Sequence, residues 1–186
     1  MPSFLPSLPP RPPASTLNAK LDNIMGLDEL GLHGNAPNGF MWLTDQLAPN
    51  ALPGVYFCVD FQEEIRLSAL KLWNYNEGNG YETRGVRDVA FFTAPDGAAP
   101  DPASADPYND PNWKHVMDET YSAADGENYR YQGEPLTVFP RPVKARYLLM
   151  RIKSDQGSFA KGDYHTGFSK IQFYTSKRGE TLLMVR

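Results

Sequence analysis

The chain has 186 residues, 41% of them hydrophobic and 12% aromatic, which suffices for one domain with a sizeable core and is too little for two ordinary domains. Its 18 Lys and Arg against 22 Asp and Glu give a net charge of -4, and the basic residues are scattered, so we expect no nucleic-acid partner and no anionic membrane surface. No run approaches the roughly 20 apolar residues of a membrane span, which excludes membrane insertion. The early prolines argue against a signal peptide in this chain.

The chain begins with a segment unlike the rest. Residues 1–14 include six prolines, a composition typical of an extended linker or arm. We expect one β-domain over residues 15–176. Residues 177–186 are expected to be a C-terminal extension or a last strand, since residues 182–185 are apolar, and the sequence leaves both possibilities open.

Between these ends the periodicity is that of β-strands, and no segment is convincingly helical. Short stretches rich in β-branched and aromatic residues alternate with Gly, Pro, Asn and Asp. The predicted strands are residues 55–61, 65–73, 86–93, 114–120, 136–139, 145–153 and 167–175. Such strands without crossover helices predict an all-β fold, an antiparallel β-sandwich of the jelly-roll kind. Residues 94–112, with five prolines and four aspartates, are expected to be a solvated excursion with no structure of its own.

Four aromatic or thiol side chains have expected structural places. Trp73 is predicted to face the core, Trp42 to plug the loops from beneath, and Trp113 to be structural. Cys58, the single cysteine, lies in an apolar strand and is expected to be a small buried hydrophobic residue.

The connections between antiparallel strands alternate between the two ends of a sandwich. Counting in this way places 62–64, 94–113 and 140–144 at one end. The opposite end receives four connections, 22–54, 74–85, 121–135 and 154–166. Because these four gather many aromatic and polar side chains, the end they share is the predicted functional end of the domain.

Aromatic planes stack on the C–H faces of sugars, and Asn, Asp and Arg offer planar donors and acceptors to hydroxyls. The functional end is therefore predicted to bind a glycan. Candidate ligand-binding residues are His33, Asn74, Asn76, Tyr81, Arg84, Tyr129, Tyr131, Asp163, Tyr164 and His165. Three alternatives stay open: loop tyrosines pin the loops, Asn74 and Asn76 cap turns, and Arg84 clamps a loop through backbone carbonyls.

Several motifs occur together and in order. LWNYN at 72–76 and TRGVRDV at 83–89 are accompanied by GL at 26–27, HG at 33–34, MWLT at 41–44 and VDF at 59–61. ARYLLM at 145–150 and GFSKIQF at 167–173 complete the set. Over residues 22–175 the chain resembles bacterial discoidin-like, or coagulation factor 5/8 type C, domains of the galactose-binding-like superfamily.

The resemblance implies a jelly roll that often serves as a non-catalytic carbohydrate-binding module. Such a module targets an attached catalytic or surface domain to polysaccharide, which implies an extracellular or cell-surface location. The alternative is a protein-interaction, adhesion or scaffold domain of a larger extracellular protein. An enzyme is not expected, because the acidic residues of the functional end form no paired pattern and no nucleophile or metal motif is present.

One departure from the resemblance concerns metal. Many of these domains hold a structural calcium through a Glu where this chain has Lys170, and an ammonium group does not ligate Ca²⁺. We therefore expect no cofactor and no bound metal. Two roles for Lys170 are open: it bonds first-loop oxygens, such as those of Asp22 or Asp28, in place of the metal, or it points into solvent.

Overall fold

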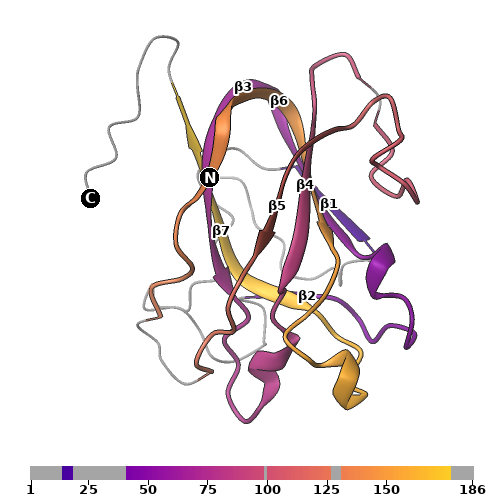
Figure 1. Ribbon diagram of the computed structural model, residues 1–186, viewed down its shortest axis with the longest axis vertical. Coiled ribbons are helices and arrows are strands. Elements are labelled where there is room, and N and C mark those ends of the chain that lie inside the picture. The colour runs from indigo at the N-terminus through magenta and orange to yellow at the C-terminus, as the bar shows by residue number, and fades with distance from the viewer. Residues whose placement is uncertain (1–13, 19–40, 99, 127–130, 177–186) are drawn as a thin grey trace.

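The computed structural model describes residues 14–18, 41–98, 100–126 and 131–176, and in these ranges the protein is built from β-strands (Figure 1). The strands are β1 (Ala14–Asn18), β2 (Trp42–Leu43), β3 (Tyr56–Asn74), β4 (Asp88–Ala94), β5 (Lys114–Thr120), β6 (Thr137–Ile152) and β7 (Gly167–Thr175). The 3-10 helices are η1 (Leu52–Gly54), η2 (Tyr81–Arg84) and η3 (Phe159–Lys161). Within these ranges, no helix is long and apolar enough to span a lipid bilayer.

One continuous sheet makes both layers of the sandwich. Its strand order is β2-β7-β3-β6-β4-β5, and β1 pairs separately with β3. The first half of β3 pairs with the second half of β6, and the second half of β3 pairs with the first half of β6 and with β7. β3 and β6 therefore bend together from one layer into the other, as the arch in Figure 1 shows.

The bend merges four of the predicted strands into two. The predicted strands 55–61 and 65–73 are one strand, β3, and 136–139 and 145–153 are one strand, β6. The expected connection at 62–64 is a register shift within β3, where Gln62 has a φ of 67°. Asp60 braces it, because its carboxylate accepts hydrogen bonds from the Gln62 amide at 2.8 Å and from Arg146 Nε at 3.0 Å.

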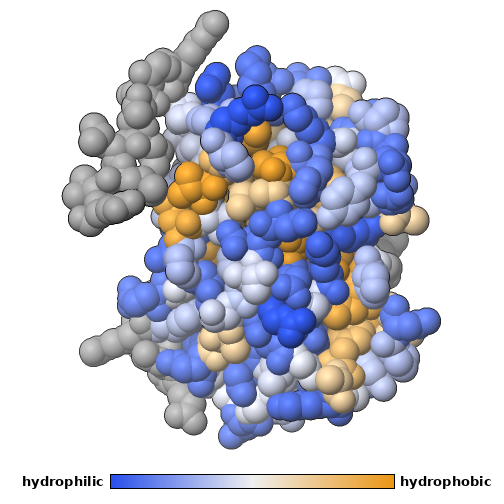
Figure 2. Space-filling model, in the orientation of Figure 1, coloured by the Kyte–Doolittle hydropathy of each residue, from blue (hydrophilic) through white to orange (hydrophobic). Residues whose placement is uncertain are grey.

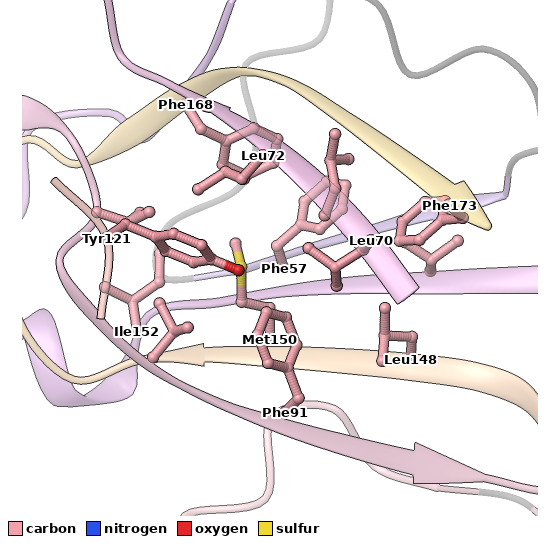
Figure 3. Packing of buried hydrophobic residues seen from close by; sticks show 14 of the residues in the cluster. Phe57, Leu70, Leu72, Phe91, Tyr121, Leu148, Met150, Ile152, Phe168 and Phe173 are labelled. Carbon is pink, nitrogen blue, oxygen red and sulfur yellow. The ribbon is translucent and has the colours of Figure 1, made fainter. Parts of the chain in front are cut away.

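The main core lies between the two layers (Figure 3). Side chains at every second position of the strands point inward, as the period of a strand requires. Phe57 of one layer meets Phe168 of the other edge to face, with ring centroids 5.0 Å apart, and Trp42 stacks on Phe168 at 5.1 Å. The predicted place of Trp42 beneath the loops is confirmed.

A second cluster covers the outer face of the β3–β6–β4 layer. Cys58 is buried there, as predicted, and Trp113 is buried with it. Trp113 donates from Nε1 to the carbonyl of Asp101 at 2.9 Å, and Ala98 packs against the same cluster. The described residues between β4 and β5 form no helix or strand and are mostly exposed, as expected of a solvated excursion, but Ala98 and Tyr108 also pack against apolar side chains of the sheet.

Trp73 is buried but does not face the main core, which contradicts the prediction. Leu70 and Leu72 belong to that core, so Trp73 lies on the opposite face of β3. Lys170 Nζ lies 4.2 Å and Lys71 Nζ 4.9 Å from the centre of its ring. Two lysines therefore cover this tryptophan through cation–π contacts.

The antiparallel prediction holds for the order β2-β7-β3-β6-β4-β5, whereas β1 pairs with β3 in parallel. β1 begins at Ala14, the last residue of the predicted arm, and Ala14 lies opposite Tyr56. The apolar residues 182–185 and residues 1–13 lie outside the described residues.

Gly167 allows β7 to approach β2 closely, because a Cβ there would overlap the carbonyl oxygen of Trp42 and lie 3.0 Å from the Cα of Leu43. Replacing Gly167 by Ala should lower the free energy of unfolding by about 1–3 kcal/mol, the usual cost of overpacking. Gly54→Ala is the control, since no atom lies within 4 Å of a Cβ at Gly54. Chemical denaturation of both variants measures the difference, and equal stability would contradict the close approach.

Candidate functional site

Hydrogen bonds between loops confirm that the predicted connections meet at one end of the sandwich. The Asn74 side-chain amide donates to the carbonyls of Val86 and Ser122, both at 2.7 Å. Asn76 Oδ1 accepts from the Gly126 amide at 3.1 Å. These bonds join the loops after β3 and after β5, and in Figure 1 η2 and η3 lie together at the end away from the arch.

The TRGV motif has a physical reason in this arrangement. A Cβ at Gly85 would lie 2.7 Å from Asn74 Oδ1, so only glycine leaves room for the buried amide. Asn74 Oδ1 also accepts from the Tyr75 amide at 3.0 Å. LWNYN and TRGV are therefore two halves of one contact.

Arg84 is the centre of the charged groups at this end. Its Nε and Nη2 donate to the two carboxylate oxygens of Asp163 at 2.6 and 3.1 Å, and its Nη1 donates to Glu77 Oε2 at 3.2 Å. The Tyr75 hydroxyl donates to the same Glu77 oxygen at 2.6 Å. Burial is the largest single influence and would lower the pKa of Arg84, but the hydrogen bonds and charge interactions with Asp163 and Tyr75 together outweigh burial, and the pKa is raised. Arg84 therefore carries a permanent charge held in one orientation.

Tyr81 presents an aromatic ring beside this arginine. The preceding residues Asn79 and Gly80 have φ values of 63° and 88°, a left-handed turn that glycine adopts without strain. Tyr81 opens η2 directly after this turn, and its side chain is 40% exposed. The Arg84 guanidinium carbon lies 4.2 Å from the ring centre, a cation–π contact that holds the ring in place.

His165 completes the group. Its Nδ1 lies 3.0 Å from the carbonyl oxygen of Thr44, which only accepts, so Nδ1 donates and Nε2 of the neutral ring is an acceptor. Nε2 lies 3.8 Å from Asp163 Oδ1. His165 and Asp163 are 21% and 29% exposed, so both remain partly open to solvent.

The structure thus brings together four of the predicted ligand-binding residues, Tyr81, Arg84, Asp163 and His165. We call this group, with Glu77, the Tyr81 site. It combines an exposed ring with one guanidinium, two carboxylates and one imidazole. Glu77, Arg84 and Asp163 together carry one net negative charge.

The other predicted ligand-binding residues are placed differently. Asn74 and Asn76 are fully buried, so they brace loops instead of presenting donors to a ligand. The Tyr131 hydroxyl donates to Glu134 at 2.7 Å, and Tyr164 packs against Phe159 with ring centroids 5.6 Å apart, which makes both tyrosines loop-pinning residues. His33 and Tyr129 lie outside the described residues.

Glu77, which belongs to the site, and the buried Tyr75, which donates to Glu77, were not predicted for the site. Glu77 is a single acid in a Gly- and Asn-rich turn, and nothing in that pattern indicates an arginine seven residues later as its partner. Tyr75 lies in the LWNYN motif, but its hydroxyl role depends on Glu77. Its pKa is raised, first by burial and then by the adjacent carboxylate.

The described residues do not fit a calcium ion at Lys170. Its ammonium group lies over Trp73 with Lys71 on the same ring, and the pKa of Lys170 is lowered by burial and then by Lys71. No cluster of three or more His, Cys, Asp or Glu suited to a metal occurs within the described ranges. Asp22 and Asp28, the partners suggested for Lys170, lie outside them.

No family model matches the sequence, and a search of curated proteins returns no match. Among solved structures, a SusE-like protein matches with a TM-score of 0.57 and 21% identity over 86% of this chain and 61% of that one, so this chain spans about 61% of its length. An F5/8 type C domain from Bacteroides fragilis matches with a TM-score of 0.49 and 14% identity over 74% of each chain. The module CBM32-3 of a family 31 glycoside hydrolase from Clostridium perfringens matches with a TM-score of 0.47 and 16% identity, over 76% of this chain and 81% of that one.

At these identities the likeness is one of fold. The search returns the F5/8 type C and CBM32 kinds of domain that the sequence motifs resemble. The strand pairing confirms the predicted all-β, antiparallel fold, and the ligand has to be inferred from this chain's own residues.

Removing the buried amide tests the loop connection. Asn74→Ala removes the side-chain donor to the Ser122 carbonyl and leaves the Val86 carbonyl with Gln156 Nε2, so we expect the free energy of unfolding to fall by about 2–4 kcal/mol. Asn79→Gly is the control, because Asn79 is exposed and left-handed and should change stability by less than about 0.5 kcal/mol. Equal loss in both variants would contradict the bracing role of Asn74.

Adding Ca²⁺ should leave the melting temperature unchanged, because ammonium groups repel the cation at Lys170. Differential scanning calorimetry with millimolar Ca²⁺ and then with chelator measures this. A rise of several degrees that the chelator reverses would contradict the expectation.

Proposed function

We propose that this chain is a non-catalytic carbohydrate-binding module that binds a glycan at the Tyr81 site. The carrying observation is the exposed Tyr81 ring next to an arginine held between two carboxylates. It supplies the two requirements of sugar recognition, an apolar plane for C–H groups and oriented polar groups for hydroxyls.

The polar groups of the site are organised before a ligand arrives. Arg84 is held by Asp163 and Glu77, and His165 by Thr44, so little side-chain entropy remains to be lost on binding. Asp163 and His165 are partly exposed and offer acceptors to hydroxyl groups. Because each hydroxyl bond replaces one with water, we expect single-site affinities on the order of micromolar to millimolar.

The same contacts favour recognition over catalysis. A glycosidase needs one carboxylic acid to give a proton and one carboxylate to act as base or nucleophile. Here Glu77 and Asp163 share the Arg84 guanidinium, so both carboxylates are paired with the same cation. The two carboxylates are therefore arranged to orient the guanidinium, and neither is placed to transfer a proton.

A module that binds its glycan weakly still raises the effective concentration of an attached domain near the polysaccharide. We propose that it targets an attached catalytic or surface domain to polysaccharide outside the cell or on its surface. The predicted alternative, an adhesion or scaffold domain, would need a larger apolar surface. In the described parts of the four loops, Tyr81 is the only exposed large hydrophobic side chain, and hydrophilic residues break up the hydrophobic areas on the face seen in Figure 2.

Removing the ring tests the proposal. A glycan array on the intact chain first identifies a ligand. Tyr81→Ala should then weaken the binding of that glycan at least tenfold, because the aromatic ring that stacks on the sugar is lost while the fold is kept. Asp163→Asn should weaken it as well by loosening Arg84. Isothermal titration calorimetry measures both, and thermal unfolding checks that Tyr81→Ala retains its stability.

Tyr108→Ala is the matched control, because Tyr108 is 52% exposed and lies in the segment between β4 and β5, away from the Tyr81 site. It should bind the glycan as the unmodified chain does. Retained binding in Tyr81→Ala, or absence of any glycan ligand, would overturn the proposal.

A further inference from the structure

A second arginine is buried in a very different setting. Arg151 lies on β6, between β3 and β4, directly opposite Tyr56 and Ala90 in the register. Its side chain emerges on the outer face of this layer, beside the cluster that the segment between β4 and β5 covers. Arg151 is only 6% exposed.

Within the described ranges, the groups that contact Arg151 carry no compensating charge. Its Nη1 donates to the carbonyl of Gly54 at 3.0 Å and its Nη2 to the carbonyl of Ser104. Among the described residues no carboxylate forms an ion pair with it, and Asp101 acts on it only from a distance. Burial lowers the pKa of Arg151. A guanidinium has five N–H donors, and the two carbonyls engage two of them.

Arg151 is one of the residues that line a hollow of about 350 Å³. Its walls come from η1 and from the segment between β4 and β5, and its floor comes from β3 and β6. The residues lining it are Pro53, Gly54, Tyr56, Ala103, Ala105 and Arg151. The lining is small and apolar apart from Tyr56 and Arg151, and the volume is in the range of sites for small molecules.

We propose that this hollow is a second binding site, for a carboxylate-bearing sugar of hexuronate size. A carboxylate matches the planar guanidinium and supplies the charge that Arg151 lacks. The Tyr56 ring, 5.9 Å from the guanidinium carbon, gives the sugar ring an apolar wall. The small alanines leave the space that such a ring needs.

The carbonyl bonds of Arg151 alone do not account for the site. A neutral side chain could join Gly54 to Ser104 without burying a charge, and a buried charge without a partner is costly. An anionic ligand offsets that cost. The site is separate from the Tyr81 site, since η1 and the β4–β5 segment line the side of the sandwich in Figure 1 while η2 and η3 lie at its end. The inference does not depend on the proposed glycan site.

Titration calorimetry with glucuronate, glucose and inorganic phosphate tests the proposal on the intact chain. Glucuronate should bind at least tenfold more tightly than glucose, which has the same ring without the charge, and more tightly than phosphate. Ala105→Trp, which fills the hollow from an exposed loop position, should abolish the binding. Ala160→Trp, at an exposed alanine of η3, is the matched control and should not affect it.

Three further variants locate the charge. Arg151→Gln keeps two carbonyl bonds possible and should weaken glucuronate binding at least tenfold. Asp101→Asn should strengthen binding two- to threefold, because it removes a distant repulsion while retaining an acceptor for the Ala103 amide. Tyr81→Ala should bind glucuronate unchanged, which separates the two sites.

Absence of glucuronate binding, or binding that survives in Ala105→Trp, would overturn the proposal. Equal affinity for phosphate would reduce the hollow to a general anion site and would also overturn it. Loss of binding in Tyr81→Ala with retention in Ala105→Trp would place the acid at the other site. If Arg151→Gln fails to fold, the glucuronate affinities of Ala105→Trp and Asp101→Asn still decide whether the acid binds in this hollow.

Discussion

The shared bend of β3 and β6 is the constraint on which the rest of this protein depends. Both strands keep their pairing on either side of the bend, so one sheet supplies both layers and encloses the core between them. Asp60 stabilises the turn by accepting from Gln62 and Arg146. Because strands close the sandwich at this end, the long connections of β3, β5 and β6 emerge at the other end, where loops are free to carry function.

Arg84 and Arg151 are both shielded from solvent, but their positive charges have opposite kinds of surroundings. Arg84 is surrounded by acceptors, with Asp163 and Glu77 both in contact, and so it orders a polar surface beside Tyr81. Arg151, as far as the described residues show, donates hydrogen bonds to two backbone carbonyls, lies near the Tyr56 ring and lines a hollow. A charge with its counterions is held in one orientation, whereas a buried charge without a counterion is costly, which is why we propose an anionic ligand at Arg151.

The fold was predictable because its signals are local. Alternation of apolar residues indicated β3 to β7, and antiparallel counting placed the loops, although neither revealed that two strands pass through the bend without interruption. Trp73 was predicted to face the core. Leu70 and Leu72 point into the core, and because side chains alternate along a strand, Trp73 points to the opposite face. Composition made residues 94–112 look solvated, and only packing against the sheet showed what Trp113 and Ala98 cover.

The sequence by itself determined most of the β-strand segments, the grouping of loops at one end and the presence there of Tyr81, Arg84, Asp163 and His165, but it did not indicate β1 or β2. Only the tertiary structure decided which polar side chains meet solvent. Asn74 and Tyr81 lie within eight positions of each other and look equally available, yet one is fully buried and the other is 40% exposed. The reason is physical: exposure and ion pairing depend on what distant segments place across from a residue, and that information is not local to its own stretch of chain.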